Sequence, residues 1–217
     1  MTEAEWLNAT NFAPLLGAAR QLSSERKLRL FVCACARHFF PTDPHPDLPR
    51  GVDMAEQMAD GTASRAVIER ASELFGSLTY VGDFHARGFV GENVFPASFV
   101  HNAVNPRVVR ATRGAWCSLS DYEADLGLEN AQIGVPWLRD IFGNPFRPVA
   151  FTPDWRTDTA ITLAAQMYES RDFSAMPILA DALQDAGCDN ANVLVHCRGS
   201  GPHVRGCWVV DLVLGKE

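Results

Sequence analysis

The strongest constraint on the fold is the apolar pattern between Glu25 and Phe39. Apolar residues recur there every three to four positions, which is the spacing of one buried helix face. Ser24 precedes the segment as a candidate N-cap. Pro41 follows it and ends the helix, because proline lacks an amide donor and disfavours helix in the residue before it. The inward positions are Leu28, Phe31, Val32, Cys35 and Phe39.

Helix signals of the same kind recur along the rest of the chain. Thr2 and Glu5 have the spacing of a capping box, and Gly61 suits the left-handed residue that follows a helix end. Thr157 and Asn190 are further candidate N-caps. The predicted class is therefore all-α or nearly so, a multi-helix, bundle-like domain with a loop-rich or small β excursion in its middle. Helices are predicted over residues 52–59, 62–75, 105–117, 136–142, 157–170, 175–186, 190–199 and 204–214.

Composition shifts divide the chain into three parts. Residues 1–75 form a helical subdomain, residues 76–134 a variable middle region, and residues 135–217 a C-terminal helical module. Glycines interrupt short aromatic runs between residues 76 and 105, which leaves loops and a small hairpin as alternatives there. We expect the parts to pack as one globular unit. Its shared core would draw on Trp6, Phe31, Trp137, Trp155 and Trp208.

Charge and hydropathy narrow the classes of partner. The 217 residues carry a formal charge of −7, with a pI near 5.3, and an acidic surface repels phosphate backbones, so nucleic acid is not expected as a partner. No apolar run approaches the roughly 20 residues of a membrane span. The first residues are acidic where a secretory signal is basic. We therefore expect a cytoplasmic protein whose six cysteines are thiols or metal ligands.

The most unusual feature is a group of cysteines and histidines near the C-terminus. Zinc takes about four thiolate or imidazole ligands, which makes this group a candidate metal site. None of its spacings matches a common zinc motif, so small, buried core cysteines are the favoured interpretation. A Cys, His and Asp arrangement that includes Asp211 is a further alternative, an enzyme site near residues 196–211. The candidate metal ligands are Cys188, His196, Cys197, His203 and Cys207.

Two other segments are candidates for binding. The glycine-rich loop at 199–206 carries His203 and Arg205, which suit an anionic ligand. For Arg205 we favour a contact with an aspartate of the protein itself or with a helix C-terminus. The segment at 139–148 mixes arginines and aromatics as partner surfaces do; the alternative is a loop pinned to the core, with Arg139 paired to Asp140 or to an N-terminal acid. Its candidate interaction residues are Arg139, Phe142, Phe146 and Arg147.

Several strings in the chain are long and unusual. They include MTEAEWL at the N-terminus, RKLRLF at 26–31, LRDIFGNPFRP at 138–148 and GPHVRGCW at 201–208. In these strings the chain resembles a family abundant in planctomycete-type bacteria, over roughly residues 1–75 and 137–217. In that family the intervening stretch is commonly rich in alanine and helical, whereas here it is rich in glycine and phenylalanine. The resemblance implies no activity.

The functional expectation rests on the catalytic and nucleotide-binding motifs that the sequence lacks. Nucleophile elbows, phosphate-binding loops and dinucleotide fingerprints are absent from the sequence. The leading hypothesis is a non-enzymatic interaction or scaffold domain with an unknown protein partner and no cofactor. The alternatives are a zinc protein that uses the C-terminal cluster, and an enzyme with an unrecognised site.

Overall fold

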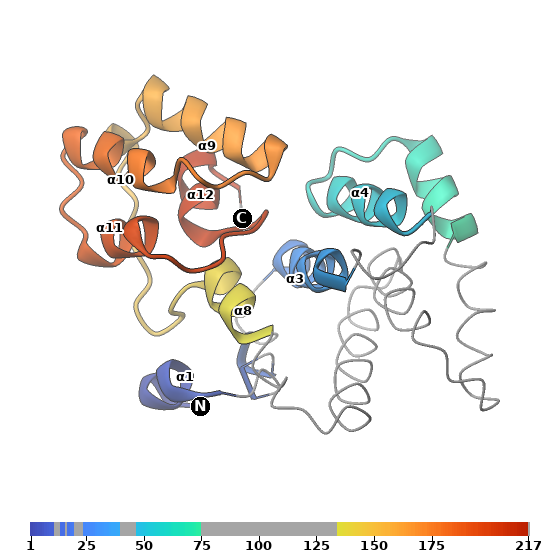
Figure 1. The fold of residues 1–217 in the computed structure, drawn as a ribbon, viewed down its shortest axis with the longest axis horizontal. Helices are drawn as coiled ribbons and strands as arrows, with labels where there is room; N and C mark the ends of the chain where they lie inside the picture. Colours follow the sequence, from blue (N-terminus) through green and yellow to red (C-terminus); the bar gives the residue numbers. More distant parts are fainter. Residues whose placement is uncertain (11–13, 16, 20–23, 40–46, 75–133, 217) are drawn as a thin grey trace. The chain divides into compact units, whose positions relative to one another are not determined.

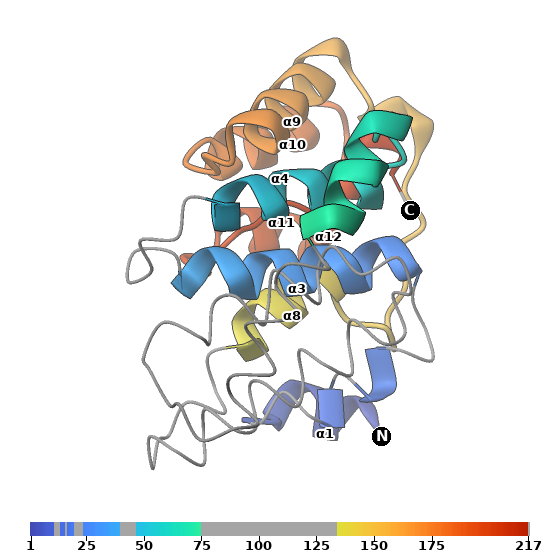
Figure 2. The same cartoon turned by 90° about the vertical axis from the view of Figure 1, so that its right-hand side faces the viewer.

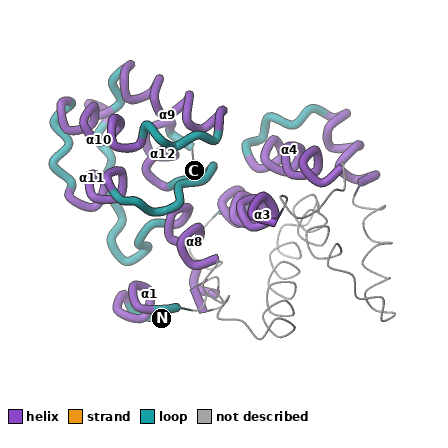
Figure 3. Tube along the Cα trace, in the orientation of Figure 1, coloured by secondary structure: helices purple, strands orange, loops and turns teal. Residues whose placement is uncertain are grey.

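A computed structural model describes residues 1–10, 14–15, 17–19, 24–39, 47–74 and 134–216. Every regular element in these ranges is a helix, and no strand occurs among them (Figure 3). The all-α class is therefore confirmed for the described part of the chain. The predictions for residues 76–133, including the helix at 105–117, lie outside the described residues. None of the described helices is long and apolar enough to cross a membrane.

The chain forms two compact units, Met1–Asn8 with Pro136–Glu217 and, separately, Ala9–Val135. The second unit holds α3 (Glu25–Phe39), α4 (Asp47–Ala59) and a helix at 65–74. The first unit holds α1 (Glu3–Asn8) and α8 (Gly134–Phe142), the latter from Pro136 onward. It continues with the short 3-10 helix η3 (Pro153–Trp155), α9 (Asp158–Ser170), α10 (Met176–Asp185), α11 (Ala191–Arg198) and α12 (Trp208–Leu214) (Figure 1).

In the second unit α3 packs against α4. The bounds of α3 are those that the apolar period predicts. Arg37 of α3 reaches Asp53 and Glu56 of α4 at 2.7 and 2.8 Å. Helix α4 begins at Asp47, five residues before the predicted start at residue 52, and its proline lies in the first turn, where a missing amide donor costs no hydrogen bond.

In the first unit, α1 is tied to the end of α8. Its N-terminus has the predicted capping box, with the backbone N–H of Thr2 donating to Glu5 and the backbone N–H of Glu5 donating to the Thr2 hydroxyl. At its C-terminus, Arg139 donates to the carbonyls of Trp6 and Leu7, both at 2.8 Å. A guanidinium there satisfies carbonyls that have no partner within the helix.

The last four helices enclose an apolar core of their own (Figure 1, Figure 2). Two of the predicted N-caps are confirmed here. Thr157 accepts from the backbone N–H of Ala160, and Asn190 accepts from the N–H groups of Asn192 and Val193. The fully buried members of this core include Ala164, Tyr168, Leu179, Leu183, Val193, Cys197, Cys207 and Val210.

The last helix is shorter than predicted. It begins at Trp208 and not at residue 204, because residues 204–207 form a tight turn in which the N–H of Cys207 donates to the carbonyl of Val204. Gly206 makes the turn possible with a φ of 94°. Trp208 is the first residue of α12. Its side chain is only partly buried, whereas the other expected core aromatics, Trp6, Phe31, Trp137 and Trp155, are buried.

Candidate metal centre

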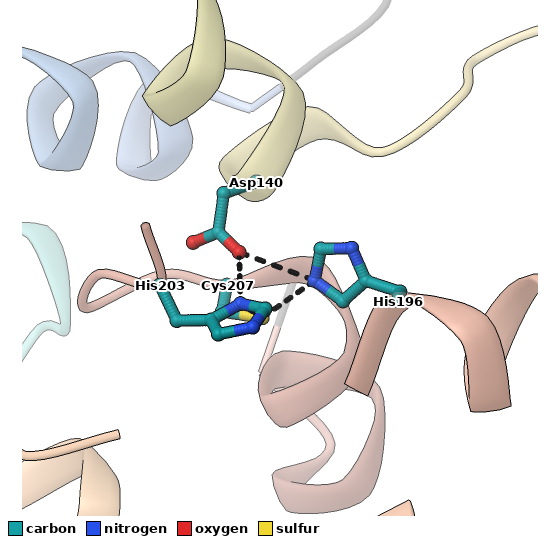
Figure 4. Close-up of side chains that lie close together, drawn as sticks. All are labelled: Asp140, His196, His203 and Cys207. Carbon is teal, nitrogen blue, oxygen red and sulfur yellow. Dashed lines mark hydrogen bonds and ion pairs between the residues drawn. The ribbon is translucent and has the colours of Figure 1, made fainter. Parts of the chain in front are cut away.

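Four side chains capable of binding a metal meet inside the first unit. Asp140 comes from the last turn of α8 and His196 from the last turn of α11. His203 lies in the loop between α11 and α12, and Cys207 is the residue just before α12. One ligand atom from each of the four lies within 4.8 Å of all the others. Figure 4 shows the Asp140 carboxylate directed from α8 toward the two imidazoles and the thiol.

Local structure explains how the chain brings three of these residues together. The Asn190 cap fixes the start of α11, which places His196 about one and a half turns later, near the end of that helix. The chain then leaves the helix at Gly199 and turns back over residues 204–207. The turn at Gly206 directs Cys207 back toward His196, with Nε2 of His196 3.2 Å from the Cys207 sulfur.

The interatomic distances resemble the edges of a coordination tetrahedron. The Oδ1 atom of Asp140 lies 2.7 Å from Nδ1 of His203 and 3.1 Å from Nε2 of His196. The Cys207 sulfur lies 3.2 Å from Nε2 of His196 and 4.0 Å from Nδ1 of His203. Zinc bonds of about 2.0–2.3 Å to O, N and S separate neighbouring ligand atoms by roughly 3.3–3.6 Å. The observed distances, from 2.7 to 4.0 Å, fall on both sides of this range.

The same atoms argue against a nucleophilic triad. In a triad the histidine uses one ring nitrogen for the nucleophile and the other for the carboxylate. Here Nε2 of His196 faces both the Cys207 sulfur and the Asp140 oxygen. Nδ1 of His203 likewise faces Asp140, with the same sulfur next to it. All four groups therefore converge on one point, as ligands do, and do not form a relay.

The site is largely removed from solvent. Asp140 is 3% exposed and Cys207 0%, while the side chains of His203 and His196 are 8% and 20% exposed. A buried carboxylate is costly unless it is paired. Asp140 accepts a hydrogen bond from the backbone N–H of Val204 through its second oxygen, Oδ2, at 2.9 Å, which leaves Oδ1 for the centre of the cluster.

Electrostatics favour the anionic form of Asp140 and disfavour that of Cys207. Burial raises the pKa of the Asp140 carboxyl, but the hydrogen bonds and charges of His196 and His203 outweigh it and hold this pKa below its usual value. Burial, with the nearby Asp140 charge, raises the pKa of the Cys207 thiol well above its usual value. A neutral buried thiol is a poor nucleophile, whereas a bound cation would favour the thiolate form of Cys207.

The Trp208 side chain packs next to the cluster. Its ring centroid lies 5.1 Å from that of His196. On another side, the indole lies against the backbone of Gly143, where a Cβ atom would meet indole carbons at 3.1–3.3 Å. Gly143 follows α8 directly and has a φ of 63°. The indole thus contacts both the helix that carries Asp140 and the ring of one histidine.

Three of the five metal ligands proposed from the sequence belong to this cluster, His196, His203 and Cys207. Cys188 and Cys197 do not; both are buried in the core of α9–α12. Sequence reasoning missed Asp140, although one signal was present. It follows Trp137 by three residues and adjoins Ile141, which puts a carboxylate on the buried face of a short apolar helix. Such a carboxylate requires a partner.

Arg205 contacts other parts of the protein, in keeping with the intramolecular role favoured from the sequence. Its guanidinium lies over the Tyr168 ring at 4.2 Å and donates to the Tyr168 carbonyl in the last turn of α9. Glu169 lies 3.7 Å away. Asp211, the acid of the alternative enzyme site, is buried in α12 and is not part of the cluster.

The residues of the candidate interaction surface are divided between internal contacts and solvent. Arg139 holds the end of α1 through the carbonyls of Trp6 and Leu7. Arg147 forms an ion pair with Glu3, the N-terminal acid. Phe142 is half-buried, and Phe146 is 38% exposed. The two arginines of this segment therefore help to hold α1 in place.

Comparison of the chain with protein-family models, with curated proteins and with solved structures gives no match. The function is therefore argued from the geometry of the cluster alone.

Proposed function

We propose that this protein binds a divalent transition metal through Asp140, His196, His203 and Cys207. Zinc is the leading candidate. The observation that carries the proposal is the convergence of these four ligand atoms within 4.8 Å. One thiolate, two imidazoles and one carboxylate are all zinc ligands. Magnesium and calcium prefer oxygen ligands alone, so the donor set disfavours them.

Charge balance supports the same conclusion. The two anionic ligands, Asp140 and Cys207 as a thiolate, neutralise the charge of a divalent cation, so a filled site would have no net charge. Deprotonation of Cys207 is unfavourable without the metal because burial raises its pKa. A coordinating cation removes that barrier, since a thiol bound to a metal loses its proton.

The proposed role of the metal is structural and not catalytic. Four protein ligands complete a tetrahedron and leave no position for water or substrate, as in known structural zinc sites. Three of the four ligands are at most 8% exposed. We further propose a cytoplasmic location, where reducing conditions keep Cys207 available as a ligand.

The protein-interaction hypothesis stays a prediction. Arg139 and Arg147, which suggested it, contact Trp6, Leu7 and Glu3 of the protein itself. The resemblance to the planctomycete-type family also stays a prediction, and it adds no activity to the proposal.

Metal analysis of protein purified without chelators or metal-affinity steps tests the proposal. We expect about one equivalent of zinc, and at least tenfold weaker zinc binding in Cys207→Ser. The matched control is Cys197→Ser, because Cys197 is also 0% exposed and lies outside the cluster. Wild-type protein with less than about 0.2 equivalents of zinc, even after incubation with zinc, would contradict the proposal. Equal zinc binding by the two variants would do the same.

A further inference from the structure

The cluster lies where α8 meets the α9–α12 module. The core of that module is built from residues of η3 through α12 and includes none of the buried residues of α8. Leu138 and Ile141 of α8 are fully buried, but they lie outside this core. Asp140 supplies polar contacts from α8 to the module, because it meets His196, His203 and the N–H of Val204.

One apolar contact accompanies this polar junction. Trp208 packs on Gly143, directly after α8, and on the ring of His196. A change in the position of His196 therefore also changes the surface against which Trp208 rests. Both of these contacts between α8 and the module thus involve the candidate ligands or their immediate neighbours.

Helix α1 is attached to α8 by a separate set of contacts. Arg139, next to Asp140 in the chain, holds the last carbonyls of α1. Asn144 donates to Glu3 at 2.8 Å, and Arg147 forms an ion pair with the same carboxylate. Because none of these contacts uses a ligand of the cluster, α1 and α8 can remain together when the cluster changes.

We propose that the metal works as a clasp: its binding fastens α8, with α1 attached, to the α9–α12 module, and its loss releases that pair while the module stays folded. This inference rests on the proposed function. Without the metal, hydrogen bonds among Asp140, the two histidines and Val204 join α8 to the module. With the metal, one ligand bond from α8 and three from the module meet at a single ion. Structural zinc sites contribute directly to folding stability.

The module has reasons of its own to remain folded without the metal. Its helices α9, α10, α11 and α12 pack against one another. Their shared core holds more than a dozen buried side chains, and of the four ligands of the proposed site it includes Cys207 alone. The metal therefore acts at one edge of a preformed core, and its effect is expected to be local.

Hydrogen exchange of the full chain, with and without one equivalent of zinc, tests the clasp. We expect amides of α1 and α8 to exchange at least tenfold more slowly with zinc, and amides of α9 and α10 to change by less than twofold. Asp140→Asn should lose the zinc effect on α1 and α8. The matched control, Asp181→Asn, should keep it, because Asp181 is exposed and paired with Arg198 away from the cluster.

The outcomes separate the clasp from metal binding itself. Stoichiometric zinc binding without slower exchange in α8 would overturn the clasp and leave the zinc site intact. Equal slowing in α8, α9 and α10 would also overturn it, because the metal would then stabilise the whole module. Failure to bind zinc would overturn both proposals. The main comparison is wild-type protein in two states, so it does not depend on whether Asp140→Asn folds.

Discussion

Replacing Gly143 with alanine tests the contact between α8 and Trp208. Gly143 has a φ of 63°, a left-handed conformation that costs an L-residue about 1–2 kcal/mol. The new Cβ would also meet three indole carbons of Trp208 at 3.1, 3.2 and 3.3 Å. The indole must then shift by a few tenths of an ångström, and overpacking of this kind typically costs about 1–3 kcal/mol. We therefore expect Gly143→Ala to lower the free energy of unfolding by roughly 2–5 kcal/mol.

Gly187→Ala is the matched control. Gly187 follows the end of α10 with a φ of 88°, and a Cβ there meets nothing within 4 Å. Its substitution should cost only the conformational strain, about 1–2 kcal/mol. Urea unfolding of both variants, loaded with zinc, measures the difference. Equal destabilisation of the two would refute the reasoning, because the contact with Trp208 would then contribute nothing.

Two further predictions concern the α9–α12 module. Asn190→Ala should destabilise it by about 1 kcal/mol, because the side chain caps α11 through the N–H groups of Asn192 and Val193. The control is Asn192→Ala, which should change the unfolding free energy much less because Asn192 is exposed within the helix. Burial raises the pKa of Cys197 from 9.0 to about 12, so folding favours its thiol form. That stability is complete below pH 9 and is lost as the pH rises toward 12. Unfolding measured between pH 8 and 11 should show the loss, and Cys197→Ala should make it less steep; an identical slope in the variant would refute this assignment.

The helices were predictable because their signals are local. The apolar period and a single cap gave the bounds of α3, and Thr157 and Asn190 marked the starts of α9 and α11. The start of α12 was predicted too early because residues 204–206 precede an apolar run. The chain turns at Gly206 before that run begins, and apolar periodicity does not detect a turn.

The cluster was predictable only in part because it combines local and distant residues. His196, His203 and Cys207 lie within 12 residues of one another in the sequence, and their chemistry made them candidates. Their spacings match no zinc motif because a helix end and a loop, not a short turn, bring them together. Asp140 lies 56 residues before His196, and only the tertiary fold places it beside the histidines.

The most direct test of the zinc site is X-ray absorption spectroscopy of the zinc-loaded protein at the zinc edge. The account predicts four-coordinate zinc with one sulfur at about 2.3 Å and three nitrogen or oxygen ligands at about 2.0–2.2 Å. The single sulfur signal should disappear in Cys207→Ser and persist in Cys197→Ser. A six-coordinate, all-oxygen shell, or a shell with two or more sulfurs, would contradict a centre built from Asp140, His196, His203 and Cys207.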